Sequence, residues 1–146
     1  MKMNKLTTKI LQTIRKNERG YIYELENGDF LYSNGYYIVK IKCEDMEVNP
    51  KRLFKKPEVN KVFEDCKSSK NYKEAKLKYY VKDSYMMAVF ESENGKTYVK
   101  KEYLDLFNIN EEFDFKISDN LIEPLQVIEG GEVKLIIMSI RYCGGK

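Results

Sequence analysis

Histidine and tryptophan are absent from this 146-residue chain, and cysteine and proline are scarce, at three residues each. Without histidine the chain lacks the side chain that most often serves as a general base or a zinc ligand. Catalytic triads built on histidine are therefore excluded. Cys43, Cys66 and Cys143 contain no CxxC pair, so they predict reduced thiols instead of a disulfide framework or a thiolate metal site.

Phosphate-binding glycine motifs of the GxGxxG and GxxxxGK[ST] types are also missing. A metal-dependent nuclease would need carboxylates that converge from separate elements. Five acidic residues near expected turns could do so in principle, but their spacing matches no nuclease pattern, and a solvated acidic face is the favoured interpretation; they are Asp83, Glu91, Glu93, Glu102 and Asp105. The sequence therefore predicts a protein that is not an enzyme and needs no cofactor or metal.

No apolar run approaches the roughly 20 residues of a membrane span, and no apolar segment follows the basic N-terminus as in a signal peptide. We therefore expect a cytoplasmic protein without a membrane partner. A hydrophobic fraction of 42%, with 12 Tyr and 7 Phe, is enough to build a core. At this length the chain predicts one domain over 1–146.

The formal net charge of only +3 conceals a separation of charge along the chain. Residues 2–19 and 51–82 are basic, whereas residues 102–132 are acidic and contain Lys116 as their one base. Charge separation of this kind can steer a partner, although solvated helices and turns can also differ in sign by chance. The basic segments suggest DNA contacts through Lys5, Lys9, Arg15, Lys16, Lys51, Arg52, Lys55 and Lys56.

The first half of the chain predicts a helix, three strands and a helical segment. A helical pattern covers 7–20, and Asn27-Gly28 and Asn34-Gly35 then separate three strand-like segments within 21–42. Asn27-Gly28 is typical of a type I′ turn, in which both central residues have positive φ. Residues 50–72 predict a basic helical insertion.

Within this insertion we expect a short helix at 51–55 and a second helix that begins at Pro57. Val59, Val62 and Phe63 would form the apolar side of the second helix.

The second half predicts further antiparallel strands around one short helix. Residues 100–110 form this helix, with Tyr103, Leu104 and Phe107 facing inward, and Gly130-Gly131 makes the last hairpin turn. No βαβ alternation occurs, so a parallel sheet is not expected and the fold class is α+β. The expected strands cover 77–81, 85–92, 97–99, 113–118, 125–129 and 133–142.

Most tyrosines fall in these expected strands, where two roles are open to them. Aromatic side chains on a sheet beside lysines can stack nucleic-acid bases. Alternation places half of the strand residues toward the core, and core packing with cross-strand pairing is the favoured interpretation. The tyrosines concerned are Tyr21, Tyr23, Tyr32, Tyr36, Tyr37, Tyr79, Tyr80, Tyr85 and Tyr98.

The last third of the chain resembles the end of the third domain of bacterial β sliding clamps, the processivity clamps of DNA polymerase. The matching motifs are Tyr103-Leu104-Asp105 with Phe107, Pro124-Leu125-Gln126-Val127, and Ile137-Met138 with Ile140 and Arg141. Their order and spacing agree over about 97–142. Ser139 stands where the family usually has proline.

This resemblance implies an antiparallel sheet domain with two packed helices, the first helix and the helix at 100–110, on one side of the sheet. It also implies a partner-binding region around Pro124, Gln126, Met138 and Arg141. A clamp ring contains six such domains, so a single domain would have to form a homo-oligomer to encircle DNA.

Taken together, these features predict a clamp-like, phage- or mobile-element-encoded binding protein that contacts DNA or a nucleic-acid-processing protein complex. The alternative is an inhibitor of the anti-CRISPR type, which would block the nucleic-acid or protein surface of a bacterial nuclease effector. Binding to duplex DNA that weakens steeply with salt would favour the hypothesis of a DNA-contacting protein over that of an inhibitor.

Overall fold

The computed structural model describes residues 20–42, 54–109, 112–120 and 122–141. Strands predominate over helices in these ranges. The elements are β1 (Tyr21–Glu24), β2 (Phe30–Ser33), β3 (Tyr37–Ile41), β4 (Phe54–Lys55), α2 (Pro57–Ser68), β5 (Tyr72–Lys82), β6 (Met86–Ser92), β7 (Gly95–Lys100), α3 (Lys101–Leu106), β8 (Asp114–Ser118), β9 (Leu125–Glu129) and β10 (Glu132–Ile137).

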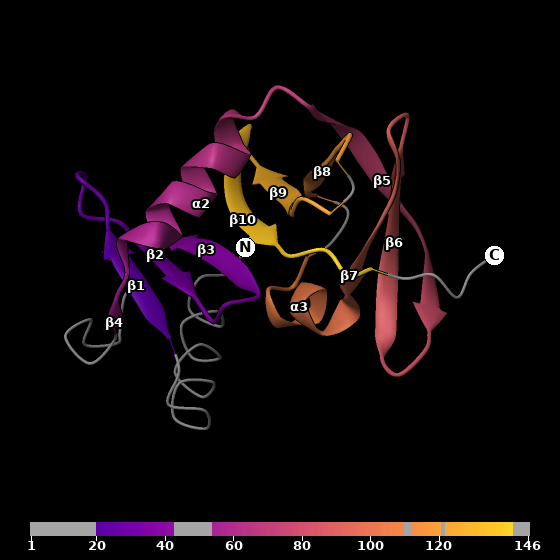
Figure 1. Ribbon diagram of the computed structural model, residues 1–146, viewed down its shortest axis with the longest axis horizontal. Helices are drawn as coiled ribbons and strands as arrows, with labels where there is room; N and C mark the ends of the chain where they lie inside the picture. The colour runs from indigo at the N-terminus through magenta and orange to yellow at the C-terminus, as the bar shows by residue number, and fades with distance from the viewer. Residues whose placement is uncertain (1–19, 43–53, 110–111, 121, 142–146) are drawn as a thin grey trace.

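The strands form one ten-stranded sheet in the order β4-β1-β2-β3-β10-β9-β8-β5-β6-β7 (Figure 1). Every pairing in this sheet is antiparallel except that of β4 with β1. The predicted α+β class and the antiparallel character of the sheet are therefore confirmed.

The expected hairpin between β1 and β2 forms, but its turn differs from the prediction. Gly28 has φ of 90°, whereas Asn27 does not adopt positive φ, so the turn is not of type I′. The Gly28 N–H donates to the Leu25 carbonyl, and the Leu25 N–H donates to Asp29 O. The loop is thus one residue longer than a two-residue turn, and Gly28 takes the left-handed position that only glycine adopts readily.

The sheet closes on itself through the residues that follow β10. The Met138 N–H donates to the Tyr36 carbonyl beside β3, and two residues later the Ile140 N–H donates to Tyr98 O in β7. Here the last strand is shorter than the predicted 133–142, since β10 ends at Ile137. The larger of two hydrophobic clusters lies on the inner face of this closed part of the sheet and extends over β1, β2 and β3.

The second predicted helix of the 50–72 segment is confirmed as α2, with Pro57 in its first turn. Val59, Phe63 and Cys66 are its buried residues, whereas Val62 is 40% exposed, so the predicted apolar side was wrong at that position. Val59, Phe63 and Cys66 lie at i, i+4 and i+7 on one helix face, and Val62 at i+3 lies at the edge of that face. The short helix expected at 51–55 is contradicted at its end, because Phe54 and Lys55 form β4; residues 51–53 lie outside the described ranges.

The two described helices cover opposite faces of the sheet. α2 packs with Leu31, Ile38 and Ile136 in the smaller cluster, whereas Leu104 and Phe107, in α3 and directly after it, join Tyr37 and other residues in the larger one. Because neighbouring strand residues point to opposite faces, Ile38 and Tyr37 mark the two sides. The inward orientation predicted for the helix at 100–110 is confirmed by the buried Leu104 and Phe107.

Tyr37 is fully buried, and its hydroxyl has no hydrogen-bond partner among the described residues. Burial raises the pKa of this phenol above its usual range. Because an unsatisfied buried hydroxyl retains its desolvation cost, we expect Tyr37→Phe to stabilise the protein by about 1 kcal/mol in urea denaturation.

Tyr72→Phe is the matched control for this prediction. The Tyr72 hydroxyl donates to Pro124 O at 2.7 Å, so its loss should destabilise the protein by about 1 kcal/mol. If both variants lose the same unfolding free energy, the hydroxyl of Tyr37 is not unsatisfied in the folded protein.

Glu132 accepts hydrogen bonds from Lys40 at 2.5 Å and from Lys134 at 3.0 Å. These bonds lower the pKa of Glu132 from 4.5 to about 2. A carboxylate with a depressed pKa stabilises the fold above its unfolded-state pKa, and this contribution is lost as the pH falls from about 4.5 to 2.

Glu132→Gln should therefore cost up to about 1 kcal/mol at pH 7, because a side chain that is 39% exposed is screened by solvent. Urea denaturation of both proteins between pH 7 and pH 3 tests this. The difference in unfolding free energy should shrink as the pH falls, and a constant difference would contradict the role given to the ionised carboxylate.

Candidate nucleic-acid interface

One face of the β5–β6–β7 ribbon carries tyrosines and lysines in successive rows. The pairings place Lys76, Glu91 and Lys96 side by side in the first row. Tyr79, Val89 and Tyr98 form the second row, and Val81, Met87 and Lys100 form the third. Cross-strand partners share a face of the sheet and the rows lie about 7 Å apart, so these side chains lie on one face, in which Met87 and Val89 of the central strand are buried.

A shift of register in β5 allows Tyr79 to join this face. The pairing with β6 slips between Leu77 and Tyr79, which leaves Lys78 as an extra residue. Residues two apart in a regular strand lie on the same side of the sheet. Without this bulge, Tyr79 would therefore point toward the larger cluster, as Leu77 does. The bulge therefore brings an aromatic ring to the outside of the ribbon.

Three tyrosines around these rows are well exposed. Tyr36, Tyr79 and Tyr85 retain 60%, 42% and 40% of their accessible surface. Tyr36 lies between β2 and β3, at the N-terminal end of β3, and Tyr85 immediately precedes β6. Large aromatic side chains of this exposure leave ring surface that a ligand can cover.

A lysine ammonium lies beside each of these rings. Lys96 Nζ is 5.5 Å from the Tyr79 ring centre, and Lys100 Nζ is 4.6 Å from that of Tyr85 and 5.9 Å from that of Tyr36. Lys100 thus stands between two exposed rings that come from distant parts of the chain. We call Tyr36, Tyr79, Tyr85, Tyr98, Lys76, Lys96 and Lys100 the tyrosine–lysine surface.

The charge of this surface is positive at neutral pH. A hydrogen bond of 3.2 Å with the Tyr79 hydroxyl raises the pKa of Lys96, so this amine stays protonated. Within the three rows, Glu91 is the one carboxylate that faces Lys76 and Lys96, and Glu102 in α3 forms an ion pair with Lys100 at 3.6 Å. Two ammonium groups beside exposed rings, with Lys76 nearby on the same face, suit an anionic ligand that also has flat apolar surfaces.

The structure does not bring the sequence-predicted DNA contacts to this surface. Lys55 and Lys56 are exposed beside β1, where Lys56 Nζ lies 4.5 Å from the Tyr21 ring centre. Figure 1 shows β1 and β4 at the opposite end of the molecule from the β5–β6 hairpin. The other six predicted contacts, and the helix predicted for 7–20, lie outside the described residues; these contacts are Lys5, Lys9, Arg15, Lys16, Lys51 and Arg52.

Of the predicted partner-binding residues, Gln126 serves the fold instead. It is 3% exposed, and its side-chain amide donates to the Cys66 carbonyl at the end of α2 at 2.7 Å. The structure therefore places this amide beneath the surface, where it holds α2 on the sheet. Pro124 is half-buried and its carbonyl accepts from Tyr72, whereas Met138 is half-buried and Arg141 is exposed.

A buried thiol completes this link between α2 and β9. Cys66 Sγ lies 3.1 Å from the Tyr72 hydroxyl, and burial raises the pKa of the thiol. Cys66 is a free thiol in the structure, and Cys43 and Cys143 lie outside the described residues. A raised pKa and a buried position disfavour the reactive thiolate.

The described ranges contain no group of three or more acidic or cysteine side chains placed to hold a metal ion. None of the helices in these ranges is long and apolar enough to cross a membrane. Comparison with family models, with curated proteins and with solved structures finds no match to this chain.

Base stacking by strand tyrosines is one of the two roles that the sequence leaves open, but the sequence does not single out the lysines beside them. The signal was present in the alternation of lysine and aromatic residues over 76–100. What the sequence did not reveal was the bulge at Lys78 and the position of Tyr36 next to Lys100, since both depend on the register of the sheet.

Proposed function

We propose that this protein is a non-enzymatic binding protein for single-stranded nucleic acid and that the tyrosine–lysine surface is its binding site. The observation that supports this most is the pairing of three exposed rings with two ammonium groups at 4.6 to 5.9 Å. Proteins that bind single strands without sequence preference combine aromatic platforms for the bases with cations for the backbone.

Each part of the surface has a role in this proposal. Tyr79 and Tyr85 stack on unpaired bases, and Tyr36 extends the platform across Lys100. Lys76, Lys96 and Lys100 contact phosphates without reading the sequence. Bases in a duplex are stacked on each other and cannot cover these rings, so single strands should bind more tightly than duplexes.

This proposal retains the predicted contact with nucleic acid and moves it from the basic segments to the sheet. The sliding-clamp resemblance and its homo-oligomer stay predictions, as does the inhibitor alternative. In the inhibitor alternative, the acidic residues 102–132 would present phosphate-like charge to a basic channel of the target. Some of these residues are paired within the chain, since Glu132 contacts two lysines and Asp105 contacts Lys101 at 2.7 Å.

Fluorescence anisotropy with labelled single-stranded oligo(dT), oligo(rU) and a mixed-sequence duplex tests the proposal. We expect the single strands to bind more tightly than the duplex at the same salt concentration. Three phosphate contacts predict that log K falls with log salt with a slope of about −2 for a single strand.

The slope provides a control within the same experiment. Lys100→Ala should make the slope less steep by about 0.7, whereas Lys61→Ala on the exposed side of α2 should leave it unchanged. Absence of binding at low salt, or stronger binding to the duplex, would overturn the proposal.

A further inference from the structure

Strand β5 is longer than the strand that pairs with it on one side. β8 pairs with β5 over Tyr72–Ala75, and the ladder ends at Ala75 opposite Phe115. Within the described ranges, residues 76–82 of β5 pair with β6 alone. Their other edge presents backbone N–H and C=O groups, which is the feature that accepts an additional strand.

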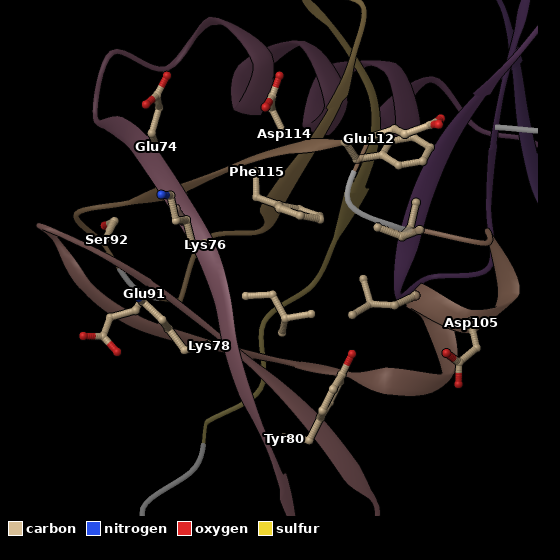
Figure 2. A pocket seen from close by; sticks show the side chains of 15 residues that line it. Glu74, Lys76, Lys78, Tyr80, Glu91, Ser92, Asp105, Glu112, Asp114 and Phe115 are labelled. Atoms are coloured by element: carbon tan, nitrogen blue, oxygen red, sulfur yellow. The ribbon is translucent and has the colours of Figure 1, made fainter.

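A groove of about 1230 Å³ lies along this edge (Figure 2). Its apolar lining comes from three elements: Leu77 on β5, Leu104 on α3, and Phe115 on β8, with Ile109 and Phe113 between the last two. Leu104 and Phe113 are buried, whereas Leu77, Ile109 and Phe115 keep part of their surface accessible. The groove therefore offers apolar contacts directly beside an open strand edge.

Carboxylates outnumber lysines around the groove. Glu74, Lys76 and Lys78 project from β5 and Glu91 from β6, while Asp105, Glu112 and Asp114 stand on the other sides (Figure 2). Tyr80 closes the far end, and its ring centre is 5.6 Å from Lys101 Nζ. A ligand between these walls would meet acidic side chains opposite the free edge of β5.

We propose that the groove receives an extended segment of a partner protein, which adds to residues 76–82 of β5 as a further strand. Alternate side chains of an extended segment point in opposite directions. One set would be apolar and would enter the groove beside Leu77 and Leu104. The other would be basic and would face Asp105, Glu112 and Asp114, so a segment with alternating apolar and basic residues fits best.

A second copy of the chain fits this edge poorly. Pairing of two β5 edges would bring Lys76, Lys78 and Lys82 of one copy close to the same lysines of the other, and like charges across a ladder are destabilising. Nucleic acid fits poorly as well, because the acidic wall would repel phosphates. The groove and the tyrosine–lysine surface share Lys76, but their other defining residues differ, and this inference does not depend on the proposed function.

An octapeptide of alternating valine and lysine, blocked at both ends, is the probe for this site. We expect it to bind in a fluorescence titration at low salt at least tenfold more tightly than the corresponding valine–glutamate peptide. Backbone binding should also protect amides within 76–82 from hydrogen exchange. A valine–lysine peptide with a central proline should bind at least fivefold more weakly, because proline lacks an N–H for the ladder.

Two substitutions at one exposed position locate the contact. Asp114→Lys should weaken binding of the valine–lysine peptide at least fivefold and Asp114→Asn by less, while oligo(dT) binding stays within about twofold. Thermal denaturation of both variants checks that they are folded.

Equal binding of the two charged peptides, no binding of either, or protection elsewhere than 76–82 would overturn the inference. If the amides of residues 76–82 are protected from hydrogen exchange without peptide and the protein has a dimeric mass in solution, two copies pair through β5 and the inference is overturned.

Discussion

Replacing Tyr79 and Tyr85 together with alanine should reduce the affinity for single-stranded oligo(dT) by about 30-fold or more. Stacking of one base on an aromatic side chain contributes about 1–3 kcal/mol, so two rings account for about 2–6 kcal/mol. Both rings are exposed and lie beside lysines, so their removal should cost little stability. Anisotropy titrations at a fixed salt concentration measure the effect.

Phenylalanine at the same two positions is the matched control. It keeps the stacking surface and removes the hydroxyls, including the one that contacts Lys96. Affinity should therefore stay within about threefold of the original protein. If the alanine and phenylalanine variants lose affinity equally, the rings do not stack on bases.

The largest loss of stability is expected for Phe107→Ala, at about 3–5 kcal/mol. Phe107 is 1% exposed, and its ring meets that of Tyr37 edge to face at 4.8 Å between centres. Removing it leaves a cavity where the end of α3 meets β3, inside the larger cluster. A change of this size is a large part of the stability of a small domain, so the variant should unfold at a much lower urea concentration.

Ile122→Ala is the control for this substitution. Ile122 is 56% exposed, so its truncation should change the unfolding free energy by less than about 0.5 kcal/mol. A small effect of Phe107→Ala would mean that α3 does not close the cluster.

The strands and turns could be predicted from the sequence because their signals are local. Alternating residues flanked by Asn-Gly or Gly-Gly pairs define β1, β2, β3, β9 and β10 within a few residues. Pro57 likewise marks the start of α2, since proline is suited to the first turn of a helix. Such signals require no knowledge of which strands become neighbours.

The missed features depend on contacts between distant parts of the chain. Cys66 is buried and Val62 exposed because the face of α2 that carries Val59, Phe63 and Cys66 packs against β1, β2 and β10. The sequence pattern predicts Gln126 to be a polar residue of a strand. In the structure it lies under α2 and donates a hydrogen bond to the last turn of that helix. A pattern in the sequence specifies the period of an element but not the neighbour that covers it.

In the candidate site, too, the local features could be predicted from the sequence and the contacts between distant residues could not. The sequence revealed tyrosines and lysines in the right segments, and the usual expectation that strand tyrosines pack in the core is correct for Tyr32 and Tyr37. It is incorrect for Tyr79 because a bulge reverses the side on which this residue lies. Tyr36 and Lys100 are separated by 63 intervening residues, and only the closed sheet places them together.

Mapping of the amide NMR shifts that change when oligo(dT) is added tests the central claim most directly. The account predicts changes concentrated at Tyr79, Tyr85, Lys96 and Lys100, extending to Tyr36, with little change around Lys55 and Lys56. Changes centred on β1 and β4, or none at saturating oligo(dT), would contradict the assignment of this surface to single-stranded nucleic acid.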